Sequence, residues 1–74
     1  MEIKIQIGLR IKELRKKEGI SQQELSFRSD LDRTYITQVE NGKRNISIVN
    51  IGKIANALNI SIKELFNDEQ FDNN

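Results

Sequence analysis

The 74-residue sequence contains no cysteine, no histidine and no proline, and it has only four glycines. Without cysteine and histidine the chain has no disulfide framework, no Cys/His zinc site, no thiol nucleophile and no histidine for acid–base catalysis. No apolar run is longer than two residues, whereas a membrane-spanning helix needs roughly 20. The first residues also lack the order of a signal peptide, so we expect a cytoplasmic protein with no membrane partner.

The chain is also too short to enclose much internal volume. A domain of this length buries only about 60% of the surface that its unfolded chain exposes, which leaves little room for an active-site cavity. Asp68, Glu69 and Asp72 could pair their carboxylates around a metal ion, but they lie in a polar stretch with no sign of a pocket. We therefore expect a solubilising end there, no metal, no cofactor and no enzymatic activity.

Charge is distributed unevenly, although twelve basic and eleven acidic residues give a net charge of only +1. Residues 1–53 hold eleven of the basic and seven of the acidic residues, a net charge of +4, whereas residues 54–74 have a net charge of −3. A basic body with an acidic end indicates a polyanionic partner for the body. An ordinary solvated surface fits the same distribution, so charge alone does not decide the function.

A helix-start pattern, Ile-Ser-x-x-Glu-Leu, occurs at residues 20–25 and again at residues 60–65. The serine can accept from the amide three residues on, the glutamate can reach back to the serine amide, and the flanking Ile and Leu can close a hydrophobic staple. Two further starts carry the staple without the full pattern. Together they predict helix starts near Ser21, Asp32, Ser47 and Ser61.

The expected helix ends complete an all-α prediction. Gly19 and Gly42 are expected to end helices in the left-handed conformation. Residues 3–11 alternate like a strand but fit a helix equally well, and a lone strand would have no partner in an otherwise helical chain. On that helix Ile5 and Leu9 fall on a second face, which could meet another helix, the tail or a partner chain. We predict five helices, over about residues 4–17, 21–29, 32–41, 47–58 and 61–66.

The second and third predicted helices have the spacing of a helix-turn-helix. Leu25 and Leu31 bracket the turn, and Ile36 and Val39 form the apolar inner face of the helix predicted over residues 32–41. Ser26 is small, as needed where two helices cross, and Asp30 lies where the turn requires a positive φ, which Asp tolerates. When two helices cross in this way, the helix at residues 32–41 projects from the domain, so that its N-terminal half can enter a major groove.

The side chains expected on the outer face of that helix are suited to reading DNA bases. They are Arg33, Thr34, Thr37 and Gln38, with Tyr35 at the edge. Arg can bind guanine through two hydrogen bonds, Gln can bind adenine, and a Thr methyl group can contact the methyl group of thymine. A helix with a purely structural role seldom needs such a set on one exposed stripe. We therefore predict binding to double-stranded DNA.

Further polar residues are placed to hold this helix on the DNA backbone. Helix starts offer free amides and a favourable dipole to an anion, and basic loop residues add positive charge. The predicted phosphate-binding residues are Ser21, Gln22, Lys43, Arg44, Asn45 and Ser47. Taken singly, each has a structural alternative: a helix cap for the serines, a solvated turn for the basic pair, and a surface amide for the glutamine.

Four stretches of the sequence resemble the Cro/repressor-like helix-turn-helix proteins, the XRE family. They are residues 7–15, 21–25, 36–42 and 51–65. The resemblance spans nearly the whole chain. It implies a five-helix, lambda-repressor-like DNA-binding domain over residues 1–66, followed by a polar acidic tail at residues 67–74.

The same resemblance has consequences for single residues. It implies an ion pair between Arg15 and Glu40 that ties the first helix to the end of the third; the alternative is two unrelated surface charges. The sequence departs from the family at Ser26, where Ala is usual, and at Asp30, where Gly is usual. Neither departure is expected to upset the fold, although both could lower stability slightly.

Residues 31–36 and 42–47 look like the controller proteins of restriction–modification systems, which are small dimeric regulators. This closer resemblance implies base or phosphate roles for residues already singled out: Arg33, Thr34, Tyr35, Arg44, Asn45 and Ser47. It also implies a homodimer formed through the C-terminal helices. The apolar residues available for that interface are Ile60, Ile62, Leu65 and Phe66, with Phe71 as a further candidate, although most of them also suit the monomer core.

We therefore expect a sequence-specific transcription regulator. A monomer of this size offers few base contacts, so two copies related by a two-fold axis would bind a pseudo-palindrome with their recognition helices about 34 Å apart. RNA polymerase is a candidate second partner. Two alternatives stay open: another XRE-type repressor, and an antitoxin-like interaction module whose third helix meets a protein.

Overall fold

The structure of the protein is a computed structural model, and it describes residues 2–72. All regular secondary structure in that range is helical. The elements are α1 (Ile3–Glu18), α2 (Gln22–Ser29), α3 (Arg33–Glu40), α4 (Ile48–Ala57), α5 (Ile62–Leu65) and the short 3-10 helix η1 (Glu69–Phe71). The all-α prediction is confirmed, and the five α-helices lie where the sequence predicted them. None of these helices is both long and apolar enough to cross a membrane, as far as residues 2–72 show.

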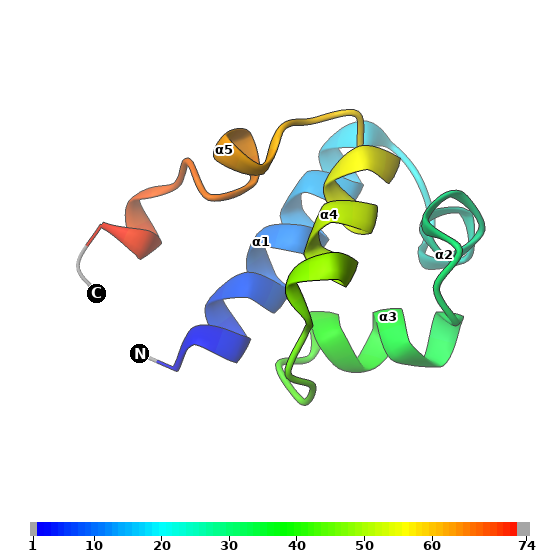
Figure 1. Ribbon diagram of the computed structural model, residues 1–74, viewed down its shortest axis with the longest axis horizontal. Helices are drawn as coiled ribbons and strands as arrows, with labels where there is room; N and C mark the ends of the chain where they lie inside the picture. The colour runs from blue at the N-terminus through cyan, green and yellow to red at the C-terminus, as the bar shows by residue number, and fades with distance from the viewer. Residues whose placement is uncertain (1, 73–74) are drawn as a thin grey trace.

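Helices α1 and α4 lie at the centre of the molecule, with α2 and α3 at one end and α5 and η1 at the other (Figure 1). The core is formed by Ile11, Leu14, Leu25, Ile36, Val39, Ile54, Ala55, Ala57, Leu58 and Leu65. Each of the five α-helices contributes at least one of these side chains. Burial of the core therefore holds the α2–α3 pair in a fixed orientation on the rest of the domain.

Helix α1 resolves the ambiguity between strand and helix at the start of the chain. Ile11 is fully buried on its inner face, whereas Ile5 and Leu9 are 43% and 49% exposed. The strand-like alternation does not follow burial, because the polar residues Gln6 and Arg10 are buried whereas the apolar Ile5 and Leu9 are exposed. Two faces of α1 thus carry apolar side chains, and only one of them belongs to the core.

The predicted helix starts are confirmed by their caps. Ser21, Ser47 and Ser61 each accept a hydrogen bond from the backbone amide three residues ahead, at 3.0–3.1 Å. The carboxylate of Asp32 accepts from the amide two residues ahead at 3.2 Å. Caps of this kind typically stabilise a protein by about 1 kcal/mol each. The local sequence therefore accounts for where α2, α3, α4 and α5 begin.

The predicted helix ends at Gly19 and Gly42 are also confirmed, whereas one predicted side-chain contact at a helix start differs. Gly19 and Gly42 have φ angles of 77° and 73°, the left-handed conformation that glycine adopts most easily. The carboxylate of Glu24, predicted to reach back to the helix start, accepts from Nε of Arg28 at 2.9 Å. A charged donor one turn ahead on the same face draws the carboxylate to it.

Helices α1 and α3 touch through their backbones at Gly8. A Cβ atom at this position would lie 2.9 Å from the carbonyl oxygen of Glu40 and closer still to that of Val39. Only glycine allows this approach, because both neighbours are backbone atoms that cannot rotate away. Helix α1 therefore fixes the position of the C-terminal half of α3.

The segment after α5, where the sequence predicts a polar acidic tail, is held against α1. The guanidinium group of Arg10, a residue only 8% exposed, donates to the carbonyl oxygens of Leu65 at 2.9 Å and Glu64 at 2.8 Å. It also donates to the carbonyl of Asn67 at 3.2 Å. These carbonyls lie at the C-terminal end of α5, where helices leave acceptors without intrahelical partners.

Two further contacts hold η1 in place. The side-chain amide of Gln6 donates to the carbonyl of Gln70. The rings of Phe66 and Phe71 meet edge to face, with centroids 5.2 Å apart. These contacts hold the segment in place although it is rich in acidic residues. The last two residues of the predicted tail, 73–74, lie outside the described residues.

Candidate nucleic-acid interface

The turn between α2 and α3 is closed by the two residues that depart from the family pattern. The hydroxyl of Ser26 donates to the carbonyl oxygen of Leu31, and the amide of Leu31 donates back to the Ser26 carbonyl at 3.2 Å. Asp30 ends α2 with φ at 58°, the positive value that the sequence predicted. An alanine at position 26 would lack the hydroxyl donor, so the serine adds a contact to this turn.

Helix α3 divides cleanly into an inner and an outer side. Ile36 and Val39 are 0% and 2% exposed, and they fix the inner side against the core. Four of the predicted base-reading residues lie on the other side, where Arg33 and Thr34 are exposed and Thr37 and Gln38 are partly exposed. The structure therefore brings these four polar side chains together on one projecting surface.

Tyr35, at the edge of α3, joins the loop that leaves this helix. The guanidinium carbon of Arg44 lies 4.7 Å from the centre of the Tyr35 ring. The same arginine donates to Oε1 of Gln38 at 3.0 Å. The hydroxyl of Tyr35 accepts from the side-chain amide of Asn50 at 3.1 Å. Sequence reasoning missed Asn50, whose only signal was a place in the first turn of α4.

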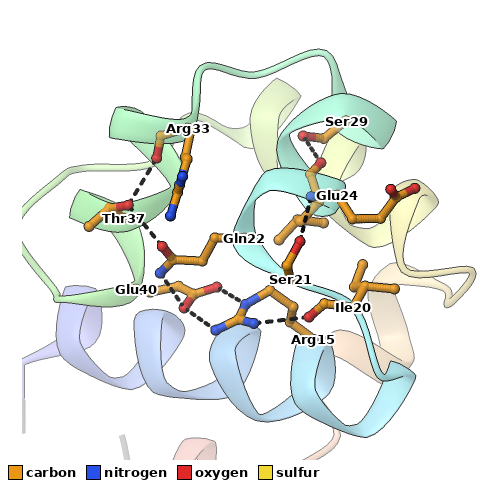
Figure 2. A network of polar contacts seen from close by, with 10 residues as sticks. Arg15, Ile20, Ser21, Gln22, Glu24, Ser29, Arg33, Thr37 and Glu40 are labelled. Atoms are coloured by element: carbon orange, nitrogen blue, oxygen red, sulfur yellow. Dashed lines mark hydrogen bonds and ion pairs between the residues drawn. The ribbon is translucent and has the colours of Figure 1, made fainter.

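A buried ion pair joins α1 to α3. The guanidinium of Arg15 donates to both carboxylate oxygens of Glu40, at 2.7 and 3.0 Å, and to the carbonyl of Ile20 at 3.0 Å (Figure 2). The two side chains are only 10% and 1% exposed. The pair implied by the family resemblance thus exists in the structure, and it ties the end of α1 to the end of α3.

Gln22, predicted to bind phosphate, turns its side chain toward α3. Its amide nitrogen donates to Glu40 at 3.1 Å, and its amide oxygen accepts from the hydroxyl of Thr37 at 3.1 Å (Figure 2). One amide hydrogen of Gln22 is left for a phosphate. The chain of contacts from Arg15 through Glu40 and Gln22 to Thr37 connects the buried ion pair to the outer side of α3.

The other predicted phosphate-binding residues surround α3 at the surface. Ser21 is exposed at the start of α2, and Ser47 is exposed at the start of α4. Lys43 and Asn45 are exposed in the loop between α3 and α4. The amide of Lys43 donates to the carbonyl of Gln38 at 2.9 Å, so this loop folds back beside α3. Two helix starts and one basic loop therefore flank the outer side of the recognition helix.

The residues expected at a dimer interface fall into two groups. Ile62 is 47% exposed, and Ile60 and Phe66 are partly buried. Leu65 is only 1% exposed, so it belongs to the monomer core and cannot contact a partner chain. This corrects its place in the expected interface. The physical reason is the length of α5, four residues that offer one inward-facing position to the core.

Comparison with known proteins gives this geometry a family. The family model described as helix-turn-helix matches residues 11–65. The control protein C.MunI of a Mycoplasma species is 50% identical over 68 residues, which cover 90% of this chain and 92% of that protein. The control protein C.BamHI of Bacillus amyloliquefaciens is 42% identical over 64 residues, covering 85% of this chain and 79% of that protein.

Solved structures agree with these relatives. The restriction–modification controller protein C.AhdI from Aeromonas hydrophila has a TM-score of 0.85 and 48% identity, covering 89% of this chain and 100% of that one. The C.Esp1396I controller tetramer, solved with its natural 35 base-pair operator, has a TM-score of 0.84 and 32% identity, covering 89% and 87%. Proteins of this family are transcription regulators and not enzymes. The chain belongs to the helix-turn-helix family that contains the restriction–modification controller proteins.

Proposed function

We propose that this protein is the controller of a restriction–modification system and regulates transcription by binding a pseudo-palindromic operator as a dimer. The observation that carries the proposal is the row of Arg33, Thr34, Thr37 and Gln38 on the outer side of a helix whose inner side is fixed by the core. Membership of the family supports it, as does the operator complex of the C.Esp1396I controller.

In this proposal α3 enters the major groove and its outer side reads base edges. Arg33 binds guanine, since it is exposed and its guanidinium donates to Gln23 Oε1 only at a long 3.3 Å. Thr34 and Tyr35 contact bases nearer the start of the helix, and Gln38 reads adenine. One good two-hydrogen-bond contact of this kind discriminates against a wrong base by about 1–3 kcal/mol.

The DNA backbone is held by the groups that flank α3. The starts of α2 and α4 present backbone amides to phosphates, and the loop between α3 and α4 adds positive charge. The proposed phosphate-binding residues are Ser21, Gln22, Lys43, Arg44, Asn45 and Ser47. Arg44 also lies over the ring of Tyr35, so it couples backbone binding to the position of a base-reading side chain.

Dimerisation places two recognition helices on successive major grooves, about 34 Å apart. The proposed interface uses Ile62, which is 47% exposed, with Ile60 and Phe66 beside it. An exposed isoleucine on the four-residue helix α5, at the end of the molecule away from α2, fits a surface that a second copy covers (Figure 1). Two half-sites would then supply the specificity that one small monomer lacks.

Selection of bound sites from random duplex DNA tests the proposal directly. We expect a two-fold repeated half-site and an affinity that falls steeply with salt, because phosphate contacts release counterions. Arg33→Ala should relax base preference at one position of the half-site, whereas Lys43→Ala should weaken all sequences alike. Binding to every duplex with equal affinity at low salt would contradict the proposal and favour a protein partner for α3.

The cytoplasm, where the operator DNA and RNA polymerase are found, is the proposed place of action. A regulator seated beside a promoter could recruit or block RNA polymerase. Transcription from an operator-bearing template with purified polymerase distinguishes the two outcomes. A change in transcript level that disappears with Arg33→Ala would support the role, and an unchanged level would contradict it.

A further inference from the structure

We propose that Thr37 selects a base carrying an exocyclic amino group, adenine through N6 or cytosine through N4, and that Gln22 imposes this choice together with the backbone carbonyl of Arg33. The inference rests on the proposed function, in which α3 enters the major groove. Its basis is a set of hydrogen bonds that orients the Gln22 amide and keeps the hydrogen of the Thr37 hydroxyl inside the protein. Thr37 is thereby a base-selecting residue, and Gln22 is a positioning residue that acts through it.

The first step is the orientation of the Gln22 amide. Glu40 presents only acceptor oxygens, and its carboxylate already receives two N–H groups from Arg15, at 2.7 and 3.0 Å. The side chain of Gln22 meets this carboxylate at 3.1 Å. Because a carboxylate cannot donate a hydrogen bond, the amide nitrogen of Gln22 must face Glu40. The amide oxygen of Gln22 therefore points the other way, toward Thr37.

The second step is the hydrogen of the Thr37 hydroxyl. The oxygen Oγ1 of Thr37 lies 3.1 Å from the amide oxygen of Gln22 and 3.0 Å from the backbone carbonyl oxygen of Arg33 (Figure 2). Both neighbours are acceptors, and a hydroxyl has only one hydrogen. Whichever neighbour receives it, the hydrogen stays inside the protein. The partly exposed Thr37 side chain then offers DNA an acceptor lone pair and a methyl group.

The third step is the chemistry of the groove. In the major groove, adenine N6 and cytosine N4 donate hydrogen bonds, whereas guanine O6 and thymine O4 accept them. A hydroxyl that can only accept binds the amino groups and is repelled by the carbonyl oxygens. The buried pair of Arg15 and Glu40, which never touches DNA, thus sets the base preference at one position of the half-site.

The test uses the full chain, the operator obtained by site selection, and three variants. Thr37→Val removes the hydroxyl and keeps the branched shape. Thr37→Ser is the matched control, because it keeps the hydroxyl and loses only the methyl group. Gln22→Met removes the amide acceptor and leaves the two contacts between Arg15 and Glu40 in place. Each protein is titrated with operators in which one adenine or cytosine of the half-site is replaced by an analogue lacking only its exocyclic amino group.

We expect one position at which loss of the amino group weakens the unaltered protein and Thr37→Ser about fivefold to tenfold, the strength of a single net hydrogen bond. Thr37→Val should be insensitive to the same replacement. For Gln22→Met, the loss of affinity caused by removing the amino group should fall to about twofold, because only the carbonyl of Arg33 would then hold the hydroxyl hydrogen. Replacements elsewhere in the half-site should affect all four proteins alike.

Three results distinguish the inference from the proposed function on which it rests. If Thr37→Val loses affinity with every amino replacement as the unaltered protein does, Thr37 does not read an amino group. If Gln22→Met keeps the full effect, Gln22 does not control the hydroxyl. Either result overturns the inference while the operator binding stands. A protein indifferent to operator sequence overturns both the inference and the proposed function.

Discussion

The two ends of the molecule are each held by a buried arginine, but by different kinds of partner. At the α2–α3 end, Arg15 donates to the side-chain carboxylate of Glu40. At the α5 end, Arg10 donates to three backbone carbonyl oxygens, with the carboxylates of Glu13 at 2.7 Å and Asp68 at 3.4 Å as additional partners. A charge paired with a charge fixes one side chain, whereas a charge donating to carbonyls fixes a stretch of chain regardless of its sequence.

This contrast separates two tasks. The α2–α3 end must present particular side chains in particular orientations, and its buried pair extends through Gln22 to Thr37 on the outer side of α3. The α5 end must keep a short helix and the segment after it against α1, and in the proposed dimer it also carries the exposed Ile62. Each of the following substitutions tests whether the two ends are stabilised independently, in order of decreasing effect.

Glu40→Ala should cause the largest loss, about 3–5 kcal/mol in the free energy of unfolding, because it leaves the guanidinium of Arg15 buried without its counter-ion. Glu24→Ala is the matched control, since its carboxylate pairs with Arg28 at the surface and its loss should cost less than about 1 kcal/mol. Urea unfolding followed by circular dichroism measures both. Equal losses for the two variants would contradict the distinction between buried and exposed pairs.

Arg10→Met should lower the free energy of unfolding by about 2–3 kcal/mol, because the buried carbonyl of Leu65 and the partly buried carbonyls of Glu64 and Asn67 would lose their donor. Lys12→Met on the same helix serves as the control. Amide hydrogen exchange locates the damage: we expect faster exchange in α5 and η1 and little change in α2 and α3. Faster exchange confined to α2 and α3 would show that the two ends are not separate.

Gly8→Ala should destabilise the domain by about 1–3 kcal/mol, since its methyl group would meet backbone oxygens of α3. The added methyl group should also displace α3 and weaken operator binding. Gly52→Ala is the control, because a Cβ at Gly52 meets nothing within 4 Å and α4 gains helix propensity worth up to about 1 kcal/mol. Thermal unfolding compares the two, and a stabilising Gly8→Ala would contradict the tight contact of α1 with α3.

Phe71→Leu should have the smallest effect, about 0.5–1.5 kcal/mol, from loss of the edge-to-face contact with Phe66. The expected result is a slightly lower melting temperature with an unchanged affinity of each half-site for α3. An unchanged melting temperature would indicate that η1 contributes nothing to the fold. A loss of base preference would show instead that the two ends communicate.

The α2–α3 end could be predicted from the sequence because its determinants are local. A serine or aspartate at a helix start acts on an amide two or three residues away, and Asp30 adopts its positive φ within the turn itself. The spacing of Ile36 and Val39 on a helix also decides which side of α3 remains outside. These rules need no knowledge of distant parts of the chain.

The side-chain positions of Arg10, Gln22 and Leu65 depend on contacts between distant parts of the chain, which the sequence pattern does not reveal. Arg10 meets backbone carbonyls, which every residue has, so nothing in residues 64–67 identifies its partners. Gln22 turns inward only because the end of α3 places Glu40 beside it. Leu65 was expected to serve an interface, but a four-residue helix needs its single inward-facing leucine for the core.

Arg44 illustrates how the fold prepares this surface before any ligand arrives. A contact with the Tyr35 ring and a hydrogen bond to Gln38 restrict a long side chain that would otherwise sample many rotamers. Restricting such a side chain costs about 1.5–2 kcal/mol of conformational entropy, and here that loss is incurred during folding. In the proposed complex with DNA, association is therefore spared this penalty, and a lysine at the same position, which lacks the planar guanidinium, would restore it.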